Sequence, residues 1–192
     1  MTAEHVFRFD EADHAYYLDD ARIPSITQLI EMGGLVKGSD YFTDASRERG
    51  QEVHRLCADF DMGALDVPKL ETPRRGYVLA YVAACAALRP SWDAIEVADV
   101  HPGYRFAGRT DRLGTVLGRR SVLEIKSAAK AGHHAVQTAL QSILASARWP
   151  LPAESWQRLT LYVKASGKFT LDQHTDRRDL DVAMRLIKEF CR

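Results

Sequence analysis

Hydrophobic residues recur at two spacings along the chain, and these spacings predict its strands and helices. In residues 5–24, apolar and polar residues alternate on both sides of an Asp-Glu-Ala-Asp turn. This pattern is typical of a β-hairpin, with Phe7 and Phe9 on one arm and Tyr17 on the other. Ser25 then stands where a helix N-cap is expected, before apolar residues at helical spacing and a Gly-Gly stop. A hairpin and a short helix are therefore predicted at the start of the chain.

Two longer helices are predicted next. The segment from about Asp44 to Phe60 has apolar residues at positions i, i+3, i+4 and i+7, which are Val53, Leu56, Cys57 and Phe60. After a loop, residues 74–88 form an alanine-rich stretch that is apolar on most sides, as is typical of a well-buried helix.

The spacing changes to two in the middle of the chain. Four consecutive strands are predicted there, with the sequences WDAIEVADV, YRFAGRTD, RLGTVL and SVLEIKS. Short turns are expected between them, at residues 101–103, around Asp111 and at residues 118–120. This part of the chain is therefore predicted to be a β-meander.

The rest of the chain predicts a helix over residues 132–149, a hairpin across residues 166–167, and a final amphipathic helix. That helix has its inward positions at Leu180, Met184, Ile187 and Phe190. The order of elements indicates an α/β fold, in which a mixed central β-sheet, built from the β-meander and further strands, is flanked by helices. We expect a single domain over residues 1–192, with the hairpin and short helix in residues 1–40 and the helices and core in residues 41–192.

Composition and charge narrow the class of protein. The chain has 46% hydrophobic and 27% charged residues, no apolar run long enough to cross a bilayer, and no signal-peptide layout, so a cytoplasmic location and no membrane partner are expected. Net charge is zero, but residues 104–130 contain seven basic and only two acidic residues. This local excess favours a polyanionic partner or a solvated basic face. The three cysteines are far apart, which is typical of small buried thiols rather than of a zinc ribbon or an iron–sulfur cluster.

The two acids in that basic segment suggest a metal site. Glu124 and Lys126 lie two residues apart in an apolar strand, so they share one face while Leu123 and Ile125 pack on the other. Asp111 lies on or beside a nearby strand, and an Asp and a Glu at matched height can share a cation. Such oxygen ligands, with the main-chain carbonyl of Ile125 as a third, suit Mg²⁺ or Mn²⁺. Lys126 would then face a nucleophilic water or a phosphate oxygen, as phosphodiester hydrolysis requires. The alternative is an ordinary Glu–Lys ion pair, and spacing alone does not separate the two.

The segment from Gly108 to Lys126, with the helix after it, resembles the PD-(D/E)XK nuclease superfamily, in particular its RecB-like branch with the phage-type exonucleases. That branch has a Gly-x-x-Asp strand, a Glu-x-Lys strand and a helix bearing Gln-x-x-x-Tyr, and the matching positions here are Gly108, Asp111, Glu124, Lys126 and Gln137. The segments RGQEVH and HAYYLDDARIPSITQLI are similar to further segments of the same group. The matches span roughly residues 14–141 in the right order.

The resemblance implies a restriction-endonuclease-like core and a metal-dependent deoxyribonuclease. Asp111, Glu124, Lys126 and Gln137 would be catalytic, and His54 would join Asp111 and Glu124 around Mg²⁺ or Mn²⁺. It further implies an exonuclease that acts on DNA ends in recombination, repair or phage replication, with a single-strand-annealing or recombination protein as a partner. Two alternatives remain open: a structure-specific or nicking endonuclease, and a non-catalytic nucleic-acid-binding module on a nuclease fold. The cluster-binding members of the superfamily use four cysteines, so no iron–sulfur cluster is expected.

Several further positions are candidates. Glu96 is an additional acid on a predicted strand, for which a structural and a metal-binding role are equally supported. Gln141 stands where the family has tyrosine, and it lies one turn after Gln137 on the same helix face. Contacts with nucleic acid are expected from four basic residues, Arg109, Arg112, Lys130 and His133. If Asp111 lies on a strand, we expect the side chains of Arg109 and Arg112 on the face opposite to it.

Overall fold

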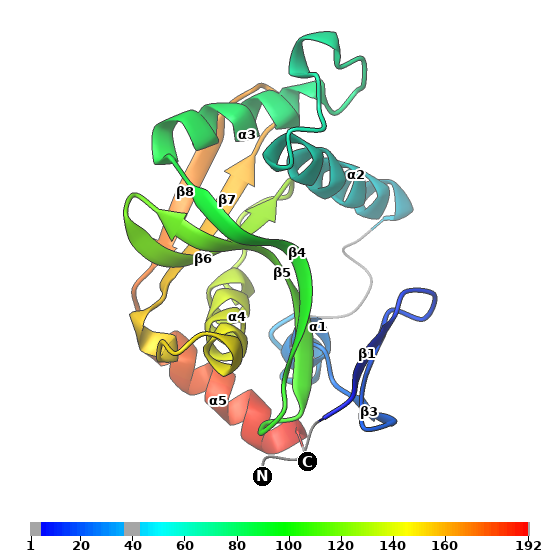
Figure 1. Ribbon diagram of the computed structural model, residues 1–192, viewed down its shortest axis with the longest axis vertical. Coiled ribbons are helices and arrows are strands. Elements are labelled where there is room, and N and C mark those ends of the chain that lie inside the picture. Colours follow the sequence, from blue (N-terminus) through cyan, green and yellow to red (C-terminus); the bar gives the residue numbers. More distant parts are fainter. Residues whose placement is uncertain (1–4, 37–42, 192) are drawn as a thin grey trace.

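The computed structural model describes residues 5–36 and 43–191, and it confirms the α/β fold with a mixed central sheet (Figure 1). The central sheet has the order β4-β5-β6-β7-β8, and only β6 and β7 are parallel. Its strands are β4 (Ser91–His101), β5 (Phe106–Val116), β6 (Arg119–Lys126), β7 (Gln157–Val163) and β8 (Phe169–His174). A second, antiparallel sheet contains β1 (Phe7–Asp10), β2 (Ala15–Leu18) and β3 (Ala21–Ile23).

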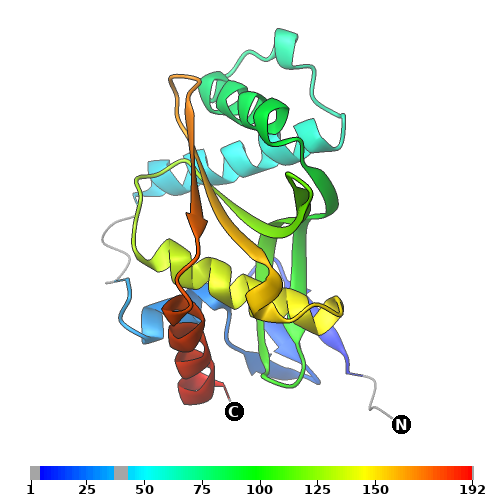
Figure 2. The ribbon, with the colours of Figure 1, turned by 90° about the vertical axis from the view of Figure 1, so that its left-hand side faces the viewer.

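Helices cover both faces of the central sheet (Figures 1 and 2). They are α1 (Ile26–Met32), α2 (Asp44–Asp61), α3 (Arg75–Leu88), α4 (His133–Arg148) and α5 (Arg178–Phe190). The helices α2 and α3 bury Val53, Cys57, Tyr81 and Ala84 against Leu123, Ile125 and Leu159 of the sheet. On the other face α4 crosses the strands, with α1 and α5 packed against it. Among the described residues, no helix combines the length and apolar character needed to cross a membrane.

The meander contains three strands instead of the predicted four. The predicted turn around Asp111 is wrong, because β5 runs without interruption from Phe106 to Val116. It pairs with β4 along its whole length and with β6 over its second half. The side chain of Arg112, next to Asp111, is fully buried and bonded to acidic partners. A buried charge that is paired with acidic partners does not have to interrupt a strand.

The predicted N-terminal hairpin and short helix are confirmed. Ser25 and Gln28 form a reciprocal capping box at α1, and Gly33 ends it. In the hairpin, Tyr16 is the buried aromatic residue, stacked on Phe9, while Tyr17 is only half-buried. The predicted helices α2 to α5 and the β7–β8 hairpin are also confirmed, within one or two residues at each end.

Gly108 attaches the N-terminal part to the central sheet. A Cβ at this position would lie 2.5 Å from the Cδ1 atom of Ile26, so a side chain here would press against the first residue of α1. The neighbouring amide of Ala107 donates a hydrogen bond to the carbonyl of Pro24, at 3.0 Å. The glycine of the Gly-x-x-Asp pattern therefore has a packing role three residues before Asp111.

Candidate metal centre

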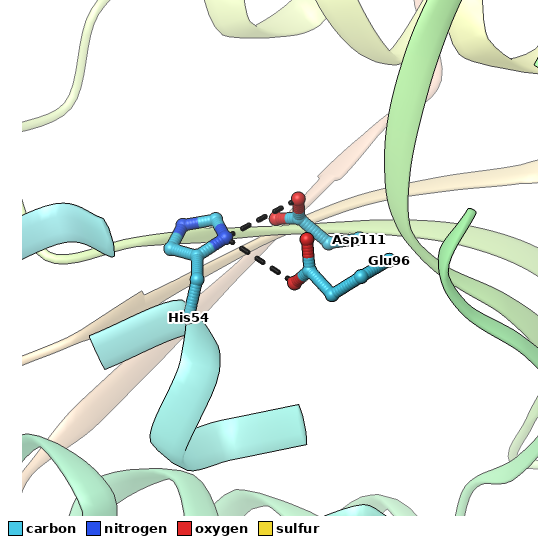
Figure 3. Close-up of side chains that lie close together, drawn as sticks. All are labelled: His54, Glu96 and Asp111. Carbon is cyan, nitrogen blue, oxygen red and sulfur yellow. Dashed lines mark ion pairs between the residues drawn. The ribbon is translucent and has the colours of Figure 1, made fainter. Parts of the chain in front are cut away.

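Three side chains from three separate elements meet beside the central sheet: His54 from α2, Glu96 from β4 and Asp111 from β5 (Figure 3). Each offers one ligand atom, and these atoms all lie within 4.8 Å of one another. The Nδ1 atom of His54 lies 3.3 Å from Oδ1 of Asp111 and 3.5 Å from Oε1 of Glu96. An imidazole and two carboxylates at this separation form a donor set that can hold a divalent cation.

The strand register aligns Glu96 with Asp111. Ile95 pairs with Arg112 and Val97 pairs with Thr110, so Glu96 lies directly across from Asp111 and points to the same face. This alignment depends on a register shift earlier in β4, between Trp92 and Ala94. Without that shift, the pairing of Trp92 with Gly114 would continue and place Glu96 across from Thr110.

The register between β5 and β6 brings Glu124 to the same level. Arg112 is paired with Leu123, so the next position along the two strands sets Asp111 beside Glu124. The amide of Ile125 on β6 donates its hydrogen bond to a side chain instead of to a main-chain carbonyl. The acceptor is the Oδ2 atom of Asp111, at 2.6 Å. Carboxylates therefore occupy one level on three adjacent strands.

Glu96 has an unusual backbone conformation for a residue inside a strand. Its φ angle is +50°, a region that side chains other than glycine, asparagine and aspartate rarely adopt. Such a conformation costs about 1–3 kcal/mol and persists where surrounding contacts enforce it. The buried guanidinium of Arg112 is one such contact, since its NH1 atom donates to Oε1 of Glu96 at 3.0 Å.

Glu124 and Lys126 share one face of β6, as predicted, and form an ion pair of 2.7 Å. The other donors to Glu124 come from one face of α4: Gln137 Nε2 at 2.7 Å and Gln141 Nε2 at 2.6 Å. Gln141 departs from the tyrosine of the family pattern, yet it still supplies a hydrogen-bond donor to this carboxylate. Leu123 and Ile125 pack into the core on the α2–α3 side, as their alternation predicted.

The charges of the centre shift one another's pKa values. Burial alone would lower the pKa of His54, but the adjacent carboxylates of Asp111 and Glu96 outweigh it and hold that pKa well above its usual value. Burial, reinforced by the charge of Glu124, raises the pKa of Asp111. For Lys126 the effect of burial is again outweighed, by Glu124 and Asp111, and its pKa is raised. The centre therefore attracts positive charge.

The donor set fits a divalent cation, but it differs from the predicted set of ligands. His54 and Asp111 come together as predicted, and Glu96 joins them. Glu124 lies beside Asp111, but its oxygens are bonded to Lys126, Gln137 and Gln141, and it is not part of the three-ligand group. The amide of Ile125, whose carbonyl was a predicted ligand, donates to Asp111.

The four predicted nucleic-acid contacts have different surroundings. Arg112 is fully buried and cannot reach a phosphate, so that prediction is wrong. The side chain of Arg109 was expected on the face opposite Asp111, which is also wrong, because residues two apart on a strand share a face. Arg109 is exposed, and its Nε atom donates to the Glu96 carbonyl at 3.0 Å. Lys130 forms an exposed ion pair with Asp172, and His133 is half-buried at the start of α4.

Two further features of the site were not predicted from the sequence. Asp61 and Tyr81 hold the buried guanidinium of Arg112 behind Glu96, although no local pattern marked either residue. His14, at the tip of the β1–β2 hairpin, lines a cavity next to the centre. It belongs to a segment that carried the family resemblance, so the sequence held a signal for it but indicated no role.

No protein-family model matches this sequence, and a comparison with curated proteins gave no match.

Proposed function

We propose that this protein is a nuclease that depends on Mg²⁺ or Mn²⁺ and hydrolyses phosphodiester bonds in DNA. The proposal includes membership of the PD-(D/E)XK superfamily and of its RecB-like branch. The observation that carries it is the aligned set of Glu96, Asp111 and Glu124 on three adjacent strands, with His54 and Lys126 beside it. Three carboxylates seldom lie side by side in a purely structural ion pair, because the charge on each carboxylate raises the free energy of the charged form of the others.

The residues have distinct roles in this proposal. His54, Glu96 and Asp111 would hold the metal ion, with Glu124 next to them. A divalent cation in this place supplies positive charge to the phosphoryl oxygens and lowers the pKa of a bound water. Lys126 uses one N–H on Glu124, which leaves two donors for a phosphate oxygen or for the attacking water.

Gln137 and Gln141 position Glu124. Their amide nitrogens donate to its two different oxygens, Gln137 to Oε1 and Gln141 to Oε2, so they fix the plane of the carboxylate from α4. Because a carboxylate held in this way cannot rotate freely, the two glutamines reduce the reorganisation that catalysis would otherwise require. The proposal also includes that the protein is an exonuclease that acts on DNA ends, and the sequence resemblance supports this part.

Degradation of end-labelled linear DNA tests this function. We expect activity with Mn²⁺ or Mg²⁺, none with EDTA, and a loss of at least about 100-fold in Lys126→Ala, since a positioned acid–base or charge-donating group contributes about that factor. Lys168→Ala is the matched control, because Lys168 is exposed in the β7–β8 turn. Equal rates in wild type and Lys126→Ala, or full activity in EDTA, would refute the proposal.

Closed circular DNA separates the two kinds of nuclease. An exonuclease leaves the circle intact, whereas cleavage of the circle identifies an endonuclease. Retained DNA binding with no Mn²⁺ binding and no cleavage of either substrate would instead identify a non-catalytic binding module.

A further inference from the structure

A cavity of about 540 Å³ adjoins the metal centre on the side of the N-terminal hairpin. We call it the hairpin cavity. It is lined by residues from the hairpin tip, from the C-terminal half of α2 and from strands β4 and β5, among them His14, Arg55, Met62, Glu96 and Arg109. His54 also lines it, so the cavity reaches the proposed metal ligands directly.

A second cavity, of about 240 Å³, lies on the other side of His54. We call it the arginine cavity. Arg47 and Arg49 from the first turns of α2 line it, together with Lys126 and the hydroxyl residues Ser46 and Ser127. The Nε atom of Arg49 is buried and has no hydrogen-bond partner among the described residues. An unsatisfied guanidinium donor next to an ammonium group is suited to a phosphate.

The two cavities meet at one place on α2. His54 and Gly50 line both of them, and these residues are one turn apart on the same helix face. A ligand that occupies both cavities therefore passes directly over the metal centre. Its phosphate would lie in the arginine cavity and its neighbouring unit in the hairpin cavity.

The hairpin cavity presents flat groups that suit a nucleobase. His14 is exposed and packs edge-on against Phe9, with ring centroids 5.3 Å apart. The guanidinium of Arg109 is exposed and lies 6.0 Å from the centroid of the same Phe9 ring. Nucleobases stack on such aromatic and guanidinium planes without regard to sequence. Met62, which is exposed at the cavity wall, adds an apolar contact.

The hairpin cavity is large enough for one nucleotide. Cavities of about 300–1,000 Å³ hold single small molecules, and a volume of 540 Å³ suits one nucleotide. A base whose faces contact His14 and Arg109 gives up its stacking on the neighbouring bases of a duplex. A base can enter only after it has left its stack, which costs least for a strand that is already unpaired.

We propose that the hairpin and arginine cavities together bind a single strand of DNA, with one unstacked base against His14 and Arg109 and one phosphate on Arg49 and Lys126. This inference rests on the proposed nuclease function and adds the form of its substrate: single-stranded ends or flaps are bound in preference to intact duplex.

Fluorescence anisotropy in EDTA, where no cleavage is expected, tests the binding site. The probes are a labelled 12-nucleotide single strand and a blunt duplex of the same sequence. We expect the single strand to bind at least about 10-fold more tightly. His14→Asn should weaken that binding about 5- to 160-fold, the equivalent of the ~1–3 kcal/mol that stacking of one base contributes. Asparagine is chosen because His14 has a φ angle of +48°, which asparagine tolerates.

Arg49→Ala tests the phosphate contact independently. We expect weaker binding of the single strand and a decrease of about 0.7 in the salt slope, which is the contribution of one phosphate contact on a single strand. Lys168→Ala, remote from both cavities, should change neither quantity. Circular dichroism spectra and melting temperatures of all variants must match those of the wild type for the comparison to stand.

Failure of this inference is distinguishable from failure of the proposed function. Duplex binding as tight as single-strand binding, or an unchanged affinity in both His14→Asn and Arg49→Ala, would overturn the inference even if the protein degrades DNA. Selective single-strand binding that depends on both residues, in a protein that cleaves no DNA with Mn²⁺, would uphold the site and refute the nuclease.

Discussion

Replacement of Arg112 by methionine should destabilise the protein strongly, although Arg112 touches no solvent. The side chain is fully buried, and its Nε atom donates to Oδ2 of Asp61 at 2.5 Å and to the hydroxyl of Tyr81 at 3.2 Å. Its NH1 atom donates to Glu96 at 3.0 Å and to the carbonyl of Asp111 at 2.6 Å. Methionine fills a similar volume but donates no hydrogen bond.

The magnitude follows from what remains after the substitution. The carboxylate of Asp61 is only 4% exposed, and its remaining donor would be the hydroxyl of Tyr81 at 2.6 Å. Glu96 would lose the guanidinium that helps to hold it in its left-handed conformation. Removal of one partner from a buried ion pair costs about 3–5 kcal/mol. A domain of this size has a free energy of unfolding of about 5–15 kcal/mol, so the effect is a large part of the total.

Urea denaturation measures this effect, and Arg120→Met is the matched control. Arg120 forms its ion pair with Asp93 at the surface, where such a pair contributes about 0–1 kcal/mol. The double variant Asp61→Asn with Arg112→Met should lose at least about 1 kcal/mol less than the sum of the two single variants, because each single change leaves the other member of the pair buried without its counter-charge. A cost below about 1 kcal/mol for Arg112→Met, or strict additivity, would refute the reasoning.

Three further outcomes are expected. Glu96→Gln should weaken Mn²⁺ binding about 10-fold or more in calorimetry, while the exposed control Glu71→Gln leaves it unchanged. Equal Mn²⁺ affinities of the wild type and Glu96→Gln would remove Glu96 from the ligand set. Gly108→Ala should lower the free energy of unfolding by about 1–3 kcal/mol in urea denaturation, because the new Cβ meets Ile26. The added change Ile26→Ala should restore part of this loss. An unchanged free energy of unfolding in Gly108→Ala would contradict the close packing of α1. In metal-free protein, folding raises the pKa of His54, so the stabilisation by its charged form is present in full below about pH 6.5 and is lost as pH rises through the higher folded-state pKa. The pH dependence of the melting temperature should therefore flatten in His54→Gln. An unchanged profile would show that His54 does not titrate between the carboxylates.

The sequence by itself determined the elements that local patterns encode. The alternation of Leu123, Glu124, Ile125 and Lys126 fixed which side chains share a face of β6, because neighbouring strand residues always point to opposite sides. The helical spacing around His54 likewise predicted α2 to within one residue at its end. These features depend only on residues close together in the chain.

The strand at Asp111 could not be predicted from the local sequence. Arg109, Asp111 and Arg112 lie within four positions, where a turn was predicted around Asp111. A strand continues there because Asp61, 51 residues away in the chain, supplies a buried counter-charge to Arg112. Whether a charged side chain interrupts a strand depends on partners brought by the fold, which no local pattern reveals.

Only the tertiary structure decided which acids meet His54. Glu96 is 15 positions before Asp111, and it reaches the centre because the register shift between Trp92 and Ala94 moves the rest of β4 by one residue along β5. Side chains on a strand alternate between faces, so one residue of register decides whether Glu96 or its neighbour lies beside Asp111. The metal centre was therefore foreseen around His54, Asp111 and Glu124, with Glu96 only as a candidate, because no local pattern shows the register that brings Glu96 into the group.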